Sequence, residues 1–301
     1  MGVHVGRQTL PIQLGAADGN GVADQRWSLH RGGRVSHHSP RHKEIASNGL
    51  ILLTEVGSGL HGVTIDNTDD HDEMGVCIPP PECVLGLEKF EQYADRWHAD
   101  GTRIPDGVRS QHGDTDHTTY ALNKWARLAA QGNPTVLLPL FAPPKSIYHK
   151  SPEGQQIVSN RNLFLSKDAG WRFHGYLKAQ RARMLGEKGR SKHKNRRELV
   201  EQFGFDTKMA YHALRLAVQG AQLMTRHNIT IPMHPIDVTW LRAVRRGEYS
   251  LGTVTGWLDS CTEGLEANIE TSTLPDHVNR DELNDFLIGL HYSFWKRTGQ
   301  L

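Results

Sequence analysis

The sequence has few cysteines and no long apolar run. Its three cysteines, Cys77, Cys83 and Cys261, form no closely spaced pair. A disulfide framework or a four-cysteine zinc site needs more cysteines, so we expect free thiols in a reducing compartment. No segment is apolar for the length that spans a bilayer, and the first residues lack a charged segment followed by an apolar stretch. We therefore expect a cytoplasmic protein that is neither secreted nor inserted into a membrane.

The net charge of +2 hides an uneven distribution. Residues 51–120 hold fourteen acidic residues against four Lys or Arg, whereas residues 151–220 hold fourteen Lys or Arg against six acidic residues. An acidic part followed by a basic part is typical of a protein that holds metal ions in one place and polyphosphate in another. By itself, the asymmetry is also explained by two solvated faces.

A chain of 301 residues is long enough for one large domain or two modest ones. Residues 1–45 contain glycine-rich and basic stretches with several histidines, which predict a flexible or peripheral arm. Strand and helix patterns are interspersed over residues 46–148, and residues 149–301 become mainly helical. We therefore predict an α+β fold with a mixed-sheet core and a helical C-terminal region.

Three strands and four helices stand out in the pattern of apolar residues. Strands are expected at residues 50–56, 74–78 and 115–122, because each is a short run bounded by turn residues or alternates in polarity. In the third of these, Asp116, Thr118 and Tyr120 share one face. Helices are expected at residues 122–131, 171–185, 207–226 and 281–296.

Gly57 and Ser58 follow the first expected strand directly. Without side-chain bulk at the glycine, backbone N–H groups can approach a phosphate, and Ser58 can donate a hydrogen bond to one of its oxygens. A helix that began there would add its own N-terminal N–H groups to the anion site. The pair therefore predicts a phosphate-binding turn.

Asp70 and Asp72 follow this turn about a dozen residues later. Alternate residues of an extended strand point to the same side, so these two carboxylates repel each other, and a hard divalent cation relieves the repulsion. Two such ions can clamp the attacking and leaving oxygens of a phosphoryl displacement. The spacing therefore predicts a site for Mg²⁺ or Mn²⁺, with two ions expected.

A strand, Gly57-Ser58, the Asp70-x-Asp72 pair and an apolar strand, in this order, resemble the DNA polymerase beta nucleotidyltransferase superfamily. Further segments are similar to the RNA-ligase-associated polymerase-beta-like nucleotidyltransferases, and the likeness covers most of residues 50–250. The residues that carry it are Leu122-Asn123-Lys124-Trp125, Gly132-Asn133-Pro134, Phe164-Leu165-Ser166, and Asp206-Thr207-Lys208 with His212 and Arg215-Leu216. The resemblance implies a polymerase-beta-like core over residues 46–148 and a region over 149–301 that completes the nucleotide site.

One position departs from this pattern. Such families often have an arginine shortly after the second aspartate, whereas Glu73 and Met74 stand here. Glu73 either adds a carboxylate near the metals or points away, since it neighbours Asp72 on a strand.

The resemblance also implies a third carboxylate from a neighbouring strand. Asp116 is favoured because it opens the strand at 115–122 and shares a face with Thr118 and Tyr120, while Asp114 has the same parity and stays an alternative. This carboxylate would bind the catalytic metal together with Asp70 and Asp72, and would help to remove the proton from the attacking hydroxyl.

Lys208, His212 and Arg215 lie four and three residues apart on one expected helical face. Cations on one face suit a triphosphate, with arginine offering bidentate geometry, although a solvated basic stripe has the same pattern. The resemblance favours nucleotide binding by these three residues, together with Gly57 and Ser58. Two histidines near these motifs are further candidates for contact with metal or substrate, His61 and His71.

The basic tract from Lys188 to Arg197 is open to two interpretations, an RNA-binding segment that releases counterions and a solvated loop. The resemblance implies transfer of an NMP from an NTP such as ATP to a hydroxyl acceptor, with an RNA or tRNA end as the first candidate. Two alternatives stay open: a protein or small-molecule acceptor, and a nucleotide-binding module without turnover. The preferred NTP, template dependence and oligomeric state are not predicted.

Overall fold

A mixed five-stranded sheet forms the centre of the computed structural model, which describes residues 38–65, 70–108, 110–186 and 197–301. The strand order is β3-β4-β2-β1-β5. β2 and β4 are parallel neighbours, and the other neighbouring strands pair antiparallel. The strands are β1 (Leu50–Val56), β2 (His71–Cys77), β3 (Gln92–Trp97), β4 (Thr115–Ala121) and β5 (Ile147–Lys150).

The three expected strands are present in this sheet. β1 has the expected bounds and β4 ends one residue earlier, whereas β2 begins at His71, three residues before the expected start. The residues from His71 to Glu73 are polar and do not extend the apolar run, yet they pair with β1 and β4. β3 and β5 were not expected. They are the edge strands of the sheet, and most of their side chains are partly or fully exposed.

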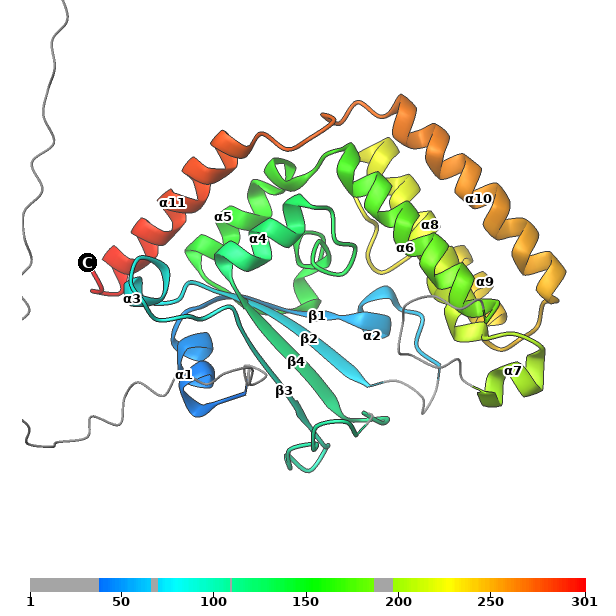
Figure 1. Cartoon of the computed structure of the whole chain (residues 1–301), viewed down its shortest axis with the longest axis horizontal. Helices are drawn as coiled ribbons and strands as arrows, with labels where there is room; N and C mark the ends of the chain where they lie inside the picture. The colour runs from blue at the N-terminus through cyan, green and yellow to red at the C-terminus, as the bar shows by residue number, and fades with distance from the viewer. Residues whose placement is uncertain (1–37, 66–69, 109, 187–196) are drawn as a thin grey trace, which may run out of the picture. The chain divides into compact units, whose positions relative to one another are not determined.

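Helices cover both faces of the sheet (Figure 1). α1 (Pro40–Asn48) buries Ile45 and Ala46 in a cluster with Cys77, Tyr93 and Ala121. On the other face lie α4 (Leu122–Ala130) and α5 (Pro152–Ser159), whose apolar residues join the main core with Val76 of β2. Val76 and Cys77 of β2 therefore pack on opposite faces of the sheet. The same alternation continues to the polar residues at the start of β2, which also point to two different faces.

The helical part of the chain packs around α8 (Thr207–Arg226), which matches its expected bounds. Its N-cap is Asp206, whose carboxylate accepts hydrogen bonds from the N–H groups of Lys208 and Met209, both at 3.1 Å. α6 (Lys167–Met184) and α10 (Leu251–Thr271) pack against it. The remaining long helices are α9 (Pro235–Arg245) and α11 (Arg280–Arg297).

Shorter helices complete the architecture. Three of them are α-helical, α2 (Gly57–His61), α3 (Pro81–Val84) and α7 (Arg197–Phe203), and three are 3-10 helices, η1 (Leu138–Leu140), η2 (Pro144–Ser146) and η3 (Arg161–Phe164). α11 returns to the sheet, where the Trp295 indole donates a hydrogen bond to the carbonyl of Pro79 at 2.9 Å. The mixed sheet with its helices confirms the expected α+β class.

The expected three-part division of the chain stays a prediction. Of the arm at residues 1–45, only residues 38–45 are described, and they include the first turns of α1 with Ile45 buried. The boundary at residue 148 falls within β5, which pairs with β1 in the central sheet. None of the described helices combines the length and apolar character that crossing a membrane requires.

Candidate active site

The glycine-serine turn lies directly against one of the expected carboxylates. β1 ends at Val56, and α2 begins at Gly57, whose φ of +75° is in the left-handed region that favours glycine. A Cβ atom on Gly57 would lie 2.0 Å from Oδ2 of Asp72. Glycine is therefore required here both for its backbone conformation and for the close approach of the turn to Asp72.

Three carboxylates meet beside this turn. Asp70 immediately precedes β2, Asp72 lies in β2, and Asp116 lies opposite Asp72 in the parallel register of β4. One carboxylate oxygen from each lies within 4.8 Å of the others, and all three residues are half-buried. A hard divalent cation prefers such an all-oxygen set of ligands, so the residues present fit Mg²⁺ or Mn²⁺.

The electrostatics of Asp72 point to the same kind of ligand. The pKa of this carboxyl is raised to about 7: burial is the largest cause, the neighbouring Asp70 and Asp116 add to it, and Lys208 and His71 oppose it. The negative charges are thus held close together at a cost in free energy. A bound cation would remove that cost.

Asp114, the alternative third carboxylate, has a different environment. It is buried, accepts a hydrogen bond from the N–H of Gln111 at 2.7 Å, and lies 3.0 Å from Nδ1 of His98. The Gln111 hydrogen bond first, and His98 second, lower its pKa. Asp114 therefore stabilises the loop before β4. Asp116 joins the carboxylate cluster and accepts a hydrogen bond from the Ser110 hydroxyl.

Each of the three expected cations of α8 interacts with the turn or with the carboxylates. Nη1 of Arg215 lies 2.6 Å from Nε2 of His61, the last residue of α2. The charge of His212 helps to lower the pKa of His61, and the charge of Lys208 lowers that of Asp72. Residues about 150 positions apart in sequence, 57–72 and 208–215, therefore form one site.

Arg215 has no carboxylate partner among the residues that the structure describes. Its Nη1 donates to Oε1 of Gln219 at 2.9 Å, while its Nε is buried without a hydrogen-bond partner in this described part. Burial lowers the pKa of Arg215, opposed by the nearby Tyr211. A buried guanidinium needs a compensating anion, and phosphate matches its geometry.

His61 links the turn to α8 by hydrogen bonds and is not part of the carboxylate cluster. It is buried, its Nδ1 lies 3.1 Å from Nε2 of Gln219, and its other ring nitrogen contacts Arg215. Burial first, then the charges of Arg215 and His212, lower its pKa well below the ordinary value. The ring is therefore neutral and accepts the guanidinium hydrogen bond.

His71 and Glu73 lie on the opposite side of the sheet from the cluster. Oε1 of Glu73 lies 3.2 Å from Nε2 of His71, and Oε2 of Glu73 lies 2.9 Å from Nδ1 of His117. His117 is the main cause that lowers the pKa of Glu73. Of the two expectations for Glu73, the structure favours the one in which it points away from Asp72 and links β2 to β4.

The sequence patterns did not identify the residues that hold the loop after α2. The Arg242 guanidinium donates to the carbonyl of Gly62 at 3.1 Å, and Arg245 donates to the carbonyl of Val63 at 3.3 Å. Both belong to α9, and no local motif links them to the turn. Gln219 was also missed, although its position four residues after Arg215 places it on the same helical face.

The structure leaves the expected role of the basic tract open. Lys188 to Arg196 lie outside the described residues, and Arg197 begins α7. Its role in RNA binding stays a prediction.

A glycine-serine turn against three carboxylates on parallel neighbouring strands is the arrangement expected of a polymerase-beta-like nucleotidyltransferase. The chain belongs to the RNA repair pathway DNA polymerase beta family, whose sequence model matches residues 34–289. This match confirms the resemblance and covers every candidate site residue. It places the chain among nucleotidyltransferases of an RNA repair pathway.

A comparison with solved structures gives a more distant likeness. A nucleotidyltransferase-like protein from Exiguobacterium sibiricum is 12% identical, over 76% of this chain and 72% of that chain, with a TM-score of 0.28. No curated protein matches the sequence.

Proposed function

We propose that the protein transfers an NMP from an NTP to a hydroxyl at an RNA end, with two Mg²⁺ or Mn²⁺ ions as cofactors. The observation that carries this proposal is the cluster of Asp70, Asp72 and Asp116 beside the Gly57-Ser58 turn. The family description supports RNA as the acceptor.

Each group of site residues has a distinct role in the proposal. Asp70, Asp72 and Asp116 would hold the ions, which when bound supply positive charge to the phosphates and acidify the attacking hydroxyl. The Ser58 hydroxyl and the backbone N–H groups of the turn would bind phosphate oxygens. Three cations of α8, Lys208, His212 and Arg215, would bind the triphosphate.

The proposed reaction is an in-line displacement at the α-phosphorus. The acceptor oxygen forms a bond to this phosphorus, the bond from the α-phosphorus to the bridging oxygen breaks, and pyrophosphate leaves. Asp116 accepts the proton of the attacking hydroxyl. Lys208 and Arg215 stabilise the charge that develops on the pyrophosphate.

The two alternatives differ from this proposal in the acceptor or in turnover. A protein or small-molecule acceptor would use the same metal and nucleotide residues. A module without turnover would not need three carboxylates, since degraded members of such families typically lose one. The complete set of Asp70, Asp72 and Asp116 therefore favours an enzyme.

The acceptor and the NTP can be identified together. The full chain is incubated with each α-labelled NTP, with Mg²⁺ or Mn²⁺, and with RNA, tRNA, DNA, protein or small-molecule fractions. Label in an RNA fraction supports the proposal. Label confined to protein or small molecules supports the first alternative, and no label in any fraction supports the module. An Asp72→Asn variant is the control for contaminating activity.

A further inference from the structure

A row of aromatic rings and cations begins on the strand face that carries Asp116. Asp116, Thr118 and Tyr120 alternate along β4 and point to the same side. Tyr120 lies four residues after Asp116 along the strand, which corresponds to about 13 Å. Nζ of Lys124, at the start of α4, lies 5.9 Å from the centre of the Tyr120 ring.

α6 brings a second ring beside the first. Tyr176 is 37% exposed. It contributes, after burial, to the raised pKa of Tyr120, so the two phenols are electrostatic neighbours. The amide of Asn133, just beyond α4, donates to the Tyr176 hydroxyl at 3.4 Å. Tyr120 therefore contacts the start of α4 through Lys124, and Tyr176 contacts the residues just beyond its end through Asn133.

The row continues into a hollow of about 1360 Å³ between α4, α6 and α11. Arg127, Trp171 and Arg172 all line it, and Trp171 is 49% exposed. Arg172 lies one helical turn before Tyr176 on α6, so the two share a face. Both arginines are exposed, and neither forms an ion pair within the described part of the chain.

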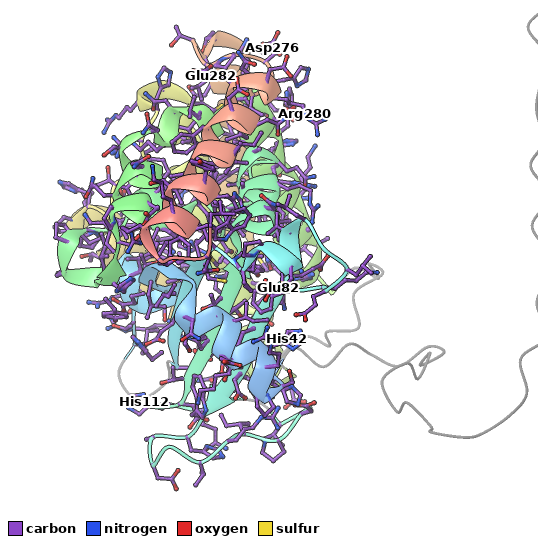
Figure 2. The ribbon with its side chains drawn as sticks, turned by 90° about the vertical axis from the view of Figure 1, so that its left-hand side faces the viewer. His42, Glu82, His112, Asp276, Arg280 and Glu282 are labelled. Carbon is purple, nitrogen blue, oxygen red and sulfur yellow. The ribbon has the colours of Figure 1, made fainter. Side chains whose placement is uncertain are left out.

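The charge around this hollow is positive. Asp168 is the only acidic side chain among its described lining residues, and it already pairs with His277 at 2.8 Å. Arg280 also lines the hollow from the first turn of α11, where Figure 2 shows it on the other side of the ribbon from Glu282. The lining therefore suits an anionic partner.

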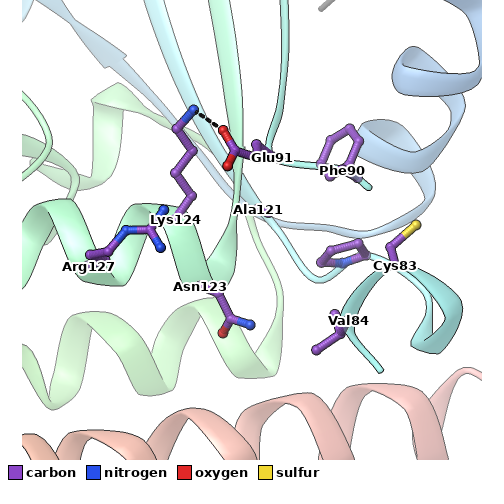
Figure 3. Close-up of a pocket in the computed structure, with 9 residues that line it drawn as sticks. Cys83, Val84, Phe90, Glu91, Ala121, Asn123, Lys124 and Arg127 are labelled. Carbon is purple, nitrogen blue, oxygen red and sulfur yellow. Dashed lines mark hydrogen bonds and ion pairs between the residues drawn. The ribbon is translucent and has the colours of Figure 1, made fainter. Parts of the chain in front are cut away.

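A smaller hollow of about 170 Å³ adjoins it and shares Val84, Asn123 and Arg127 with it. Figure 3 shows Lys124 turned toward Glu91, with which it forms an ion pair at 2.9 Å, while Arg127 lies farther along α4. Arg127 thus carries positive charge from this smaller hollow to the large one, whereas the charge of Lys124 is paired with Glu91.

We propose that Tyr120, Lys124, Arg127, Trp171, Arg172 and Tyr176 form an aromatic-basic surface that binds single-stranded RNA. Bases stack on the exposed rings, and the cations follow the phosphate backbone. The direction of the bound RNA rests on the proposed function: the RNA runs along this surface so that its end reaches Asp70, Asp72 and Asp116. It assigns the position of the acceptor, which the nucleotide site does not specify.

The test measures binding without NTP or metal. Fluorescence anisotropy of a short labelled single-stranded RNA is followed at several salt concentrations for the full chain and its variants. Tyr176→Ala and Trp171→Ala should each weaken binding by on the order of tenfold. Tyr176→Phe keeps the ring and should bind like the parent. Removing both Arg127 and Arg172 should reduce the slope of log K against log salt by about 1.4.

A matched control lies on the other side of the sheet. Lys43 is an exposed cation of α1, and Lys43→Ala should leave both the affinity and the salt slope unchanged. Thermal melting of every variant shows whether a loss of binding reflects a loss of fold.

Two results would overturn the inference. Unchanged RNA affinity in the ring and arginine variants would remove the surface from the RNA path. No RNA binding by the parent at low salt would leave the hollow to a protein partner. If RNA binds through this surface but no NMP is transferred, the proposed function fails while the surface stands.

Discussion

Asp72 is the residue on which the electrostatics of the site converge. It touches the Gly57 turn, shares its strand with Asp70, and lies opposite Asp116 in the register of β2 and β4. Its raised pKa, about 7, records both its burial and the two neighbouring carboxylates. A proton and a divalent cation are therefore alternative ways to reduce the same repulsion.

This competition predicts a pH dependence of metal binding. Because the folded pKa lies above the ordinary value of 3.8, protonation of Asp72 favours the metal-free fold, and this contribution is lost as pH rises through about 7. Metal must displace the proton, so Mg²⁺ affinity should fall below pH 7, by up to about tenfold per unit. Calorimetric titration at pH 6, 7 and 8 measures it. Equal affinity at pH 6 and pH 8 would contradict the assignment.

Asp114 and Asp116 form a matched pair two residues apart. Asp116→Asn should reduce transfer at least a hundredfold, since a lost metal ligand costs several kcal/mol and each ~1.4 kcal/mol is tenfold in rate, with an unchanged melting temperature. Asp114→Asn should keep most activity and lose about 1 kcal/mol of stability, because it weakens the contacts with Gln111 and His98. Measurements of activity and melting temperature on both variants show which aspartate is the third carboxylate. The reverse pattern would make Asp114 the third carboxylate.

At the scale of elements, the turn from β1 into α2 positions the carboxylate as much as it binds substrate. Gly57 and Gly62 both have positive φ, 75° and 74°. The Cβ atom of an alanine would meet Asp72 Oδ2 at 2.0 Å from position 57, but only Pro232 Cβ at 3.4 Å from position 62. The two glycines therefore separate backbone strain from displacement of the carboxylate.

The corresponding variants should differ in activity more than in stability. Gly57→Ala and Gly62→Ala should each cost about 1–2 kcal/mol of folding free energy. Only Gly57→Ala should also abolish transfer and weaken Mg²⁺ binding, because Asp72 must move. Chemical denaturation and metal titration measure the two effects. A Gly57→Ala variant with normal metal affinity would show that the turn does not position Asp72.

α8 carries the cations proposed to bind the triphosphate. Lys208→Ala and Arg215→Ala should each weaken NTP binding by about tenfold, since a charge-assisted hydrogen bond contributes about 1.5–3 kcal/mol. Arg226→Ala is the control, because Arg226 is an exposed cation in the last turn of the same helix. Binding of a labelled NTP is the measurement. Unchanged affinity in both site variants would show that these α8 cations do not bind the triphosphate.

Elements with a clear period could be predicted from the sequence, and elements without one could not. β1 and α8 have their expected bounds because an unbroken apolar run and a long amphipathic pattern specify them. α10 was not predicted. Its buried residues, which include Val254, Leu258 and Leu265, recur at helical spacing but are diluted by glycines and threonines.

The residues of the candidate site could also be predicted only in part from the sequence. Asp70 and Asp72 were predicted from spacing alone, whereas Asp116 and the α8 cations were assigned through a family resemblance. Their meeting depends on tertiary packing that no local pattern contains. The supporting contacts of Gln219 and Arg242 are of this kind, because each joins a helix to a turn more than 150 residues away.

At the scale of the whole molecule, the fold gives the uneven charge distribution a physical meaning. The acidic part of the sequence, residues 51–120, contains the three clustered carboxylates. The basic part, residues 151–220, contains the α8 cations that face them and the exposed side chains of α6. A carboxylate site with cations close to it suits a metal-bound polyphosphate.

The most direct test of the central claim is a paired labelling experiment. The full chain and its Asp72→Asn variant are incubated with Mg²⁺, total RNA and an NTP that carries label at either the α- or the γ-phosphate, and both RNA and released pyrophosphate are analysed. The account predicts that α-label enters RNA, that γ-label appears only in pyrophosphate, and that both signals disappear in Asp72→Asn while its fold is kept. Transfer of γ-label to an acceptor, or full activity of the variant, would contradict nucleotidyl transfer at this carboxylate site.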